Sequence, residues 1–123
     1  MGPTLFDLFK FTDGFDRKTI INILILLIEK LRYLSNHGII HYDVKPENIV
    51  WGIFNQSKIN NINECYFIDY GLAIDLENDI FENKNYKKWK IGTPRYMSIN
   101  AQKNLKPNYI ADLESFYYIP LYI

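Results

Sequence analysis

The sequence contains little cysteine and carries no net charge. A single cysteine, Cys65, excludes an internal disulfide and is typical of a protein in a reducing compartment. The 14 basic and 14 acidic side chains give a formal charge of +0, which argues against a general nucleic-acid binder with a basic surface stripe. We therefore expect protein and small anions as partners, and no nucleic acid.

Long hydrophobic runs and targeting signals are also absent. The most apolar stretch, residues 20–28, is interrupted by Asn22 and closed by Glu29 and Lys30, which leaves it short of the roughly 18 residues of a membrane span. The first residues lack a basic region and a cleavage site, and Phe6 stands where a myristoylation signal needs Ser or Thr. We expect an intracellular protein, cytoplasmic or nuclear, that does not enter a membrane.

The first half of the chain is patterned for helices. With 123 residues and 48% hydrophobic side chains, the chain fits one modest globular domain. Residues 4–10 predict a short amphipathic helix, and a longer one is predicted from Asp16, its N-cap, to about Asn36, with Gly38 just beyond its end. Apolar residues surround the axis of this helix through Ile28, so we expect it to be buried inside the domain.

Short strands and a last helix follow. Ile39 and Ile40 predict a buried strand, and 49–51 and 66–68 predict a β-hairpin with a polar loop between them. Residues 110–123 predict a core helix, which Pro120 is expected to kink at a cost of about 3 kcal/mol. The fold class is therefore α+β, mainly α.

Two polar clusters follow the predicted strands. Residues 41–48, His-Tyr-Asp-Val-Lys-Pro-Glu-Asn, are named here the Asp43 loop, and residues 68–73, Ile-Asp-Tyr-Gly-Leu-Ala, the Asp69 turn. Phosphoryl transfer needs a carboxylate to orient the attacking hydroxyl, a cation near the phosphate and oxygen ligands for Mg²⁺. Either cluster alone fits an ordinary surface loop, but both in this order make chance a poor explanation. The residues that supply these parts are Asp43, Lys45, Asn48 and Asp69.

With these residues placed, the chain resembles the large, C-terminal lobe of a eukaryotic-type protein kinase, and more narrowly the casein kinase 1 and vaccinia-related kinase group. Residues 2–9 are similar to the segment after the interlobe hinge. Gly-Thr-Pro-Arg-Tyr at 92–96 and Ser-Ile-Asn at 98–100 resemble that group's substitute for the usual Ala-Pro-Glu signature. Asp-Leu-Glu-Ser at 112–115 resembles the start of its central helix. The resemblance makes residues 1–123 a partial kinase domain, with the hairpin beside the catalytic loop.

The resemblance implies a role for each matching residue, with ATP and Mg²⁺ as cofactors. Asp43 would be the catalytic base, and Thr93 would support Asp43 and the substrate hydroxyl. Lys45 would bind ATP and neutralise charge on the transferred phosphoryl. Asn48 and Asp69 would hold Mg²⁺.

Three further residues receive roles in the same way. His41 would brace the Asp69 turn, and Asp112 would hold the backbone of the Asp43 loop. Arg95 would line an anion site for acidic or already phosphorylated protein substrates. The lysines of residues 84–90 could add to that site, or they could form an ordinary solvated loop.

The sequence also departs from the kinase pattern. Tyr42 stands where most kinases have the arginine that pairs with a phosphorylated activation segment. We therefore expect the activation segment of this chain to be ordered without phosphorylation. The 123 residues contain no glycine-rich phosphate loop, strand lysine or helix glutamate ahead of the Asp43 loop. We therefore expect activity only as part of a larger or complemented chain, and a partner that covers the face where the small lobe is missing.

Three functions fit these observations. The first is a serine/threonine protein kinase of the casein kinase 1-like group, favoured by the intact Asp43 loop. The second is an inactive kinase remnant that acts as a protein-binding module, favoured by the missing small lobe and by Pro120. The third is a small-molecule phosphotransferase of the aminoglycoside kinase type, which shares the His-x-Asp-x-x-x-x-Asn pattern. The Asp69 turn and residues 92–100 argue against the third.

Overall fold

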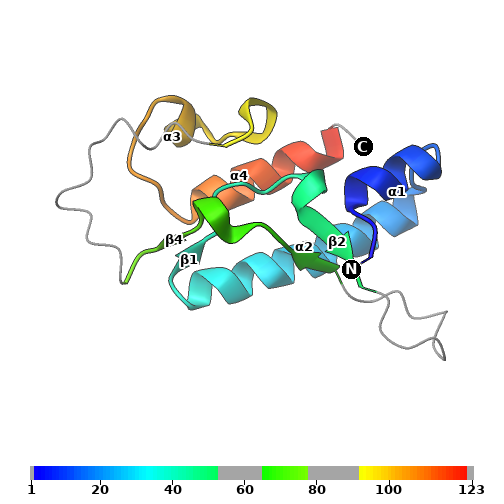
Figure 1. Cartoon of the computed structure of the whole chain (residues 1–123), viewed down its shortest axis with the longest axis horizontal. Coiled ribbons are helices and arrows are strands. Elements are labelled where there is room, and N and C mark those ends of the chain that lie inside the picture. The colour runs from blue at the N-terminus through cyan, green and yellow to red at the C-terminus, as the bar shows by residue number, and fades with distance from the viewer. Residues whose placement is uncertain (1, 53–64, 78–91, 122–123) are drawn as a thin grey trace.

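The computed structural model describes residues 2–52, 65–77 and 92–121. Helices and short strands alternate along the chain, with α2 and α4 as the longest elements (Figure 1). The helices are α1 Leu5–Phe11, α2 Arg17–Asn36, α3 Ile99–Gln102 and α4 Ile110–Tyr118. The strands are β1 Ile39–Ile40, β2 Ile49–Trp51, β3 Cys65–Phe67 and β4 Ile74–Asp75. Short 3-10 turns lie at Pro46–Asn48, Tyr70–Leu72, Pro94–Tyr96 and Ile119–Leu121.

The ends of α2 follow the predicted caps. Asp16 is the N-cap, and its side chain accepts a hydrogen bond of 2.9 Å from the backbone N–H of Thr19. Gly38 lies just past the C-cap with φ +73°, a left-handed conformation that glycine adopts without strain. The predicted boundaries of this helix are therefore confirmed.

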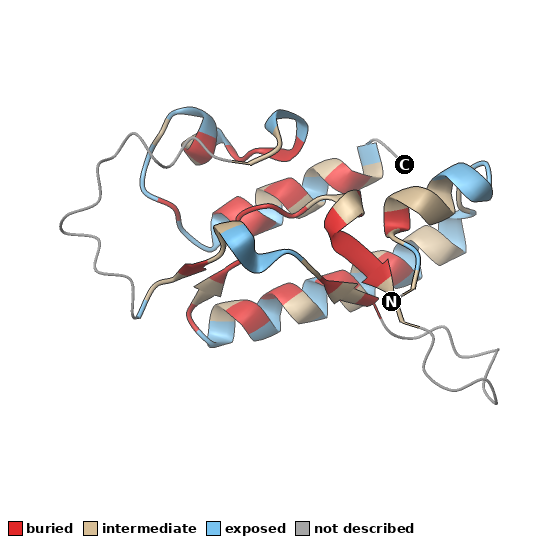
Figure 2. Ribbon diagram, in the orientation of Figure 1, coloured by how far each residue is buried: buried red, intermediate tan, exposed pale blue. Residues whose placement is uncertain are grey.

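The prediction that α2 is buried on all sides is wrong. Ile21, Ile25 and Ile28 are 49%, 51% and 46% exposed. Figure 2 shows buried and exposed residues alternating along α2. The described parts of the chain pack against one side of this helix, so only one stripe reaches the core. The buried residues of that stripe are Ile23, Leu27, Leu31 and Leu34.

Two short antiparallel ladders organise the strands. The predicted hairpin is confirmed as β2 paired with β3, with Val50 opposite Tyr66, although β3 begins one residue earlier than predicted. The second ladder pairs β1 with β4, with Ile40 opposite Ile74. Sequence reasoning did not predict β4, because a strand of two residues is too short to show alternation.

The two ladders hold the polar clusters between them. The Asp43 loop connects β1 to β2, and the Asp69 turn connects β3 to β4. Because β1 pairs with β4 and β2 with β3, each end of one segment is hydrogen-bonded to an end of the other. Figure 1 shows both segments running between the two ladders.

Two apolar clusters support this arrangement. The larger lies between α1, α2, β2, β3 and the end of α4, and the smaller lies around Tyr42 and the start of α4. The α-helical part of α4 ends at Tyr118 and passes into the 3-10 turn that contains Pro120, where the sequence predicts a kink. The polar loop at 55–64 and the lysines of 84–90 lie outside the described residues. Within the described parts, no helix has both the length and the apolar character that a membrane crossing needs.

Candidate active site

The Asp43 carboxylate is the centre of a network of side-chain hydrogen bonds. Asp43 is 8% exposed. Its Oδ1 accepts a bond of 3.1 Å from Thr93 Oγ1, and its Oδ2 accepts one of 2.9 Å from Asn48 Nδ2. Lys45 Nζ lies 3.0 Å from Oδ2 and also donates to Thr93 Oγ1 at 2.7 Å. Four of the predicted site residues, from segments about 50 positions apart in the chain, therefore meet at one carboxylate.

The local sequence fixes the side chains of the Asp43 loop. Asn48 Nδ2 also donates to the backbone carbonyl of Asp43 at 2.9 Å, which closes the loop on itself. Pro46 occupies the first position of a 3-10 turn, where its fixed φ suits the backbone and its missing N–H costs nothing. Lys45 precedes that turn in extended backbone, and its ammonium lies at the Asp43 carboxylate.

Thr93 reaches Asp43 because Gly92 allows a close approach of two backbones. Gly92 has φ +120°, and a Cβ added to it would lie 3.4 Å from the carbonyl oxygen of Tyr42. A residue with a side chain rarely adopts this conformation. The segment 92–98, named here the Thr93 turn, therefore lies directly on the Asp43 loop.

The Asp69 turn lies beside the Asp43 loop and is held by its backbone. The N–H of Ile68 donates to the carbonyl of Asn48 at 2.9 Å, and the His41 ring nitrogen Nε2 lies 2.9 Å from the carbonyl of Ile68. Asp69 is exposed, in left-handed backbone, and its Oδ1 accepts from the N–H of Gly71 at 3.3 Å. Among the described residues, the hydrogen bonds around Asp43 do not include Asp69.

The donor atoms of this region fit Mg²⁺. Both hydrogen bonds of Asn48 Nδ2 go to Asp43, which leaves the amide oxygen of Asn48 as the group that can serve a cation. Amide and carboxylate oxygens are preferred Mg²⁺ ligands, and a site completed by substrate phosphates needs only one or two from the protein. Across the described ranges, no group of three His, Cys, Asp or Glu side chains forms a metal cluster. Asn48 and Asp69 therefore stay the predicted Mg²⁺ ligands, and their side chains offer oxygens of the required kind.

A buried carboxylate holds the start of the Asp43 loop, as predicted. Asp112 of α4 is 5% exposed and accepts from the backbone N–H groups of His41 and Tyr42 at 2.7 and 2.8 Å. Burial raises the pKa of Asp112, and these two hydrogen bonds oppose that shift. Tyr42 has φ +70°, an uncommon conformation for a residue with a side chain, and Asp112 stabilises it.

The predicted anion-binding residue lies on the Thr93 turn. Arg95 is exposed in the 3-10 turn that follows Thr93. The lysines of 84–90, which the sequence leaves open as an extension of this site or as an ordinary solvated loop, lie outside the described ranges. The roles of Arg95 and of the residues around Asp43 in binding and catalysis stay predictions.

Sequence reasoning missed the contacts of Ser115. Its hydroxyl bonds the backbone carbonyl of Tyr96 in the Thr93 turn and that of Ala111 one turn earlier. A signal was available, because Asp112 and Ser115 are three positions apart and therefore share one face of α4. The burial of Asp112 indicates that this face looks toward the Asp43 loop.

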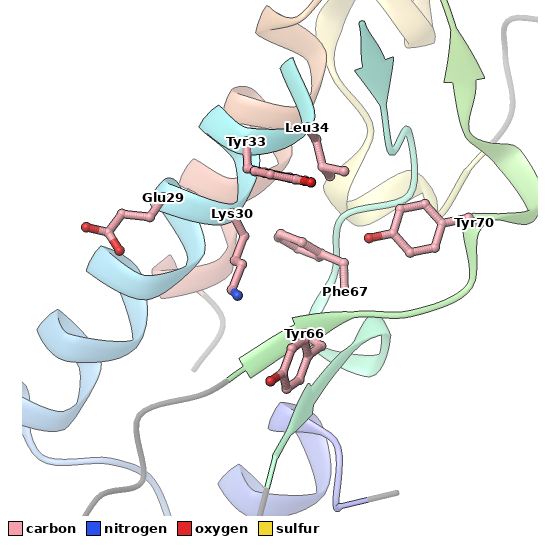
Figure 3. Close-up of a pocket in the computed structure, with 7 residues that line it drawn as sticks. All are labelled: Glu29, Lys30, Tyr33, Leu34, Tyr66, Phe67 and Tyr70. Atoms are coloured by element: carbon pink, nitrogen blue, oxygen red, sulfur yellow. The ribbon is translucent and has the colours of Figure 1, made fainter. Parts of the chain in front are cut away.

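A pocket of about 410 Å³ adjoins the Asp69 turn on the side facing α2. In Figure 3, Phe67 and Lys30 point into the space between α2 and β3, and Glu29 points away from it. The Lys30 ammonium lies 5.0 Å from the centre of the Tyr66 ring. The lining of the pocket is mainly aromatic and apolar. It consists of Glu29, Lys30, Tyr33, Leu34, Tyr66, Phe67 and Tyr70.

Comparison with known families supports the resemblance to protein kinases. A family model described as fungal protein kinase matches residues 11–123, which is nearly the whole chain. The match includes the Asp43 loop, the Asp69 turn, the Thr93 turn and α4. The predicted relationship to protein kinases is therefore confirmed, and the chain belongs to the fungal protein kinase family.

Proposed function

We propose that this chain carries the phosphoryl-transfer centre of a serine/threonine protein kinase, which moves the γ-phosphoryl of ATP to a protein hydroxyl. The observation that carries the proposal is the Asp43 carboxylate, held by Lys45, Asn48 and Thr93. Transfer of a phosphoryl group depends on positioning and charge rather than on covalent chemistry of the protein. A buried carboxylate with a bonded lysine suits both needs.

The hydrogen bonds around Asp43 suggest which oxygen receives the substrate. A carboxylate oxygen can accept two hydrogen bonds. Within the described part of the chain, Oδ2 accepts from both Asn48 and Lys45, whereas Oδ1 accepts from Thr93 alone. Oδ1 therefore has capacity for the proton of an attacking hydroxyl, and Thr93 lies beside that position.

The remaining groups supply charge. Lys45 places a cation at the carboxylate, where it can neutralise charge on the transferred phosphoryl. When bound, Mg²⁺ supplies positive charge to the phosphate oxygens, and Asn48 and Asp69 would be its protein ligands.

We extend the proposal to the casein kinase 1-like group and to acidic or already phosphorylated substrates. The Ser98-Ile99-Asn100 ending and Arg95 on the turn beside Thr93 support this assignment. Tyr42 supports activity without phosphorylation of the chain itself. Tyr42 is 8% exposed and packs in an apolar cluster with Met97 and Ile74. This packing would hold the segment in place without the ion pair that an arginine makes with a phosphorylated residue.

Thermal unfolding with and without Mg²⁺·ATP tests the proposal. A nucleotide that binds only the folded chain raises the unfolding midpoint, by an amount equivalent to about 2.7 kcal/mol at 100 times its Kd. The expected result is a Mg²⁺-dependent rise that Asp69→Ala abolishes. Asp75→Ala is the matched control, since Asp75 lies in β4, beyond the Asp69 turn. A cooperative melt with no response to nucleotide contradicts a nucleotide site in this chain.

Phosphotransfer itself is tested in the natural full-length protein with an acidic peptide. Asp43→Asn keeps an oxygen for Thr93 but removes the negative charge, so we expect activity to fall at least 100-fold. Arg95→Ala should lower activity toward a phosphorylated peptide more than toward an unmodified one. Equal loss on both peptides would contradict the anion site.

A role as a binding module is the second candidate, favoured by the aromatic pocket next to the Asp69 turn. Its volume of about 410 Å³ and its largely apolar lining are typical of binding sites. A partner that covers this face would bury Tyr33, which is 62% exposed, and Tyr70, which is 47% exposed. Under this alternative, Tyr33→Ala weakens partner binding, and Asp43→Asn leaves it unchanged.

A further inference from the structure

Helix α4 bonds the Thr93 turn as well as the Asp43 loop. Ser115 is 7% exposed, and its hydroxyl bonds the carbonyl oxygen of Tyr96. The adjacent residue, Glu114, accepts a hydrogen bond of 2.9 Å at Oε2 from the backbone N–H of Ile99. Both bonds join a side chain of α4 to backbone atoms, so they fix the path of the chain from Tyr96 to Ile99.

The first of these bonds lies close to Thr93. The N–H of Tyr96 donates to the carbonyl of Thr93 at 2.9 Å. Ser115 bonds the carbonyl of the same Tyr96 residue, so only the short 3-10 turn separates the Ser115 hydroxyl from Thr93. A serine inside a helix commonly donates its one hydroxyl proton to the carbonyl four residues earlier; the Ala111 carbonyl lies 3.1 Å from Ser115 Oγ, but the Tyr96 carbonyl is closer. The shorter contact therefore directs the single proton of a buried hydroxyl to the backbone of the Thr93 turn.

The far end of the turn is fixed by two more bonds. Gln102 Nε2 donates to the carbonyl of Met97 at 2.8 Å, and the Ser98 side chain accepts from the N–H of Ala101 at 3.1 Å. These bonds join the turn to α3, and Glu114 joins α3 to α4. The Thr93 turn, α3 and α4 are thus tied together by side chains.

One helix therefore sets the relative position of the two segments that meet at Asp43. Asp112 holds the backbone of the Asp43 loop, and Ser115, one turn later on the same helix, holds the backbone of the Thr93 turn. We propose that Ser115 and Glu114 are positioning residues, which place the Thr93 hydroxyl at the Asp43 carboxylate and at Lys45. This inference rests on the proposed phosphoryl-transfer function, in which Thr93 supports Asp43.

The distances from Thr93 to Asp43 and Lys45 explain why the Thr93 turn has to be held in place. Thr93 Oγ1 lies 3.1 Å from Asp43 Oδ1 and 2.7 Å from Lys45 Nζ, and both contacts are lost if the turn moves by about 1 Å. Gly92, next to Thr93, is the residue with the greatest backbone freedom. A restraint on the other side of Thr93 is therefore needed to hold both contacts.

Amide exchange and NMR spectra of the chain test the proposal. Ser115→Ala and Glu114→Ala remove the two bonds, whereas Ser115→Thr keeps a hydroxyl and Glu114→Gln keeps an acceptor oxygen. A lost hydrogen bond of about 1 kcal/mol corresponds to roughly five- to tenfold faster exchange. We expect this acceleration at Ile99, whose N–H loses its acceptor in Glu114→Ala. In Ser115→Ala we expect faster exchange of the Tyr96 N–H, which bonds the Thr93 carbonyl inside the loosened turn, and changed signals from Thr93 and from the Lys45 side chain. The two conservative variants should restore the wild-type spectrum.

Matched controls come from α2. Ser35→Ala removes a helix serine whose hydroxyl donates to the local carbonyl of Arg32, and Glu29→Ala removes an exposed helix glutamate. Neither should alter the signals of Thr93 or Lys45. Two results would overturn the positioning role. In the Ser115→Ala and Glu114→Ala variants, the NMR signals would change at residues 96–99 without any change at Thr93 or Lys45, or amide exchange would accelerate in α2 as much as in the Thr93 turn.

The response to Mg²⁺·ATP separates this inference from the proposed function. If the wild-type chain does not respond to nucleotide, the nucleotide site is refuted. If Ser115→Ala and Glu114→Ala still displace the Thr93 and Lys45 signals in that case, the positioning role stands. A wild-type nucleotide shift that survives Ser115→Ala, with Thr93 signals unchanged, would keep the site and refute the positioning role.

Discussion

Replacement of Asp112 by alanine should destabilise the chain more than any other loss of a single carboxylate described above. The substitution leaves the N–H groups of His41 and Tyr42 buried without their acceptor. An unsatisfied buried donor costs about 1–3 kcal/mol, so two donors cost about 2–6 kcal/mol. Relief from burying the Asp112 carboxylate, whose pKa is raised by that burial, offsets part of this cost. We expect a net loss of about 3–4 kcal/mol, a large share of the 5–15 kcal/mol typical of a domain.

Urea unfolding at pH 7, followed by circular dichroism, measures this loss. Asp112→Asn keeps one carbonyl oxygen but presents an N–H₂ group to the second donor, so its loss should be intermediate. Asp75→Ala removes a half-buried carboxylate of β4 that accepts a hydrogen bond from the N–H of Glu77, and it should cost less than Asp112→Ala, because the Glu77 N–H is exposed and can bond water instead. A loss below 1 kcal/mol in Asp112→Ala, with cooperative unfolding, would refute the view that this carboxylate holds the Asp43 loop.

Three further predictions follow from single residues. Gly92→Ala forces a side chain into backbone with φ +120°, 3.4 Å from the Tyr42 carbonyl, and should cost roughly 1–3 kcal/mol in urea unfolding; an unchanged midpoint would contradict it. Hydrogen bonds from Thr19 lower the pKa of Asp16 below the ordinary value of 3.8, so the stability that the Asp16 carboxylate contributes is present above pH 3.8 and is lost as the pH falls through the lowered pKa. Thermal melts of Asp16→Asn should therefore depend less on pH in that acidic range than the wild type, and identical slopes would argue against this origin. Burial raises the pKa of Cys65 to about 11, so a thiol reagent at pH 8 should react only after unfolding, whereas rapid labelling of the native chain would show an open site.

The parts that sequence predicted well are those with local physical causes. The boundaries of α2 follow from an N-cap side chain and a glycine with positive φ, both readable from neighbouring residues. The Asp43 loop was recognised because phosphoryl transfer demands particular side chains at fixed spacing. The structure joins Lys45 and Asn48 to Asp43 within that loop.

The parts that sequence missed depend on contacts between distant segments. The strand β4 exists because it pairs with β1, about 35 positions earlier, and its two residues carry no pattern of their own. The exposure of Ile21 and Ile25 depends on how much of the chain packs on α2, which periodicity does not report. Likewise, the Ser115 bond to Tyr96 crosses 19 positions, so the sequence indicated only the face of α4 that makes it.

The pairing of β1 with β4 and of β2 with β3 has a consequence for how this chain tolerates changes in length. The 13 residues between Trp51 and Cys65 connect β2 to β3, two strands of the same ladder. Insertions or deletions there leave the register of both ladders intact, and therefore also the separation of Asp43 from Asp69. A single residue added inside the Asp43 loop or the Asp69 turn would instead displace Asp43 relative to Asp69. Natural length variation among related sequences should therefore collect outside the two ladders, and it should be rare between β1 and β2 or between β3 and β4.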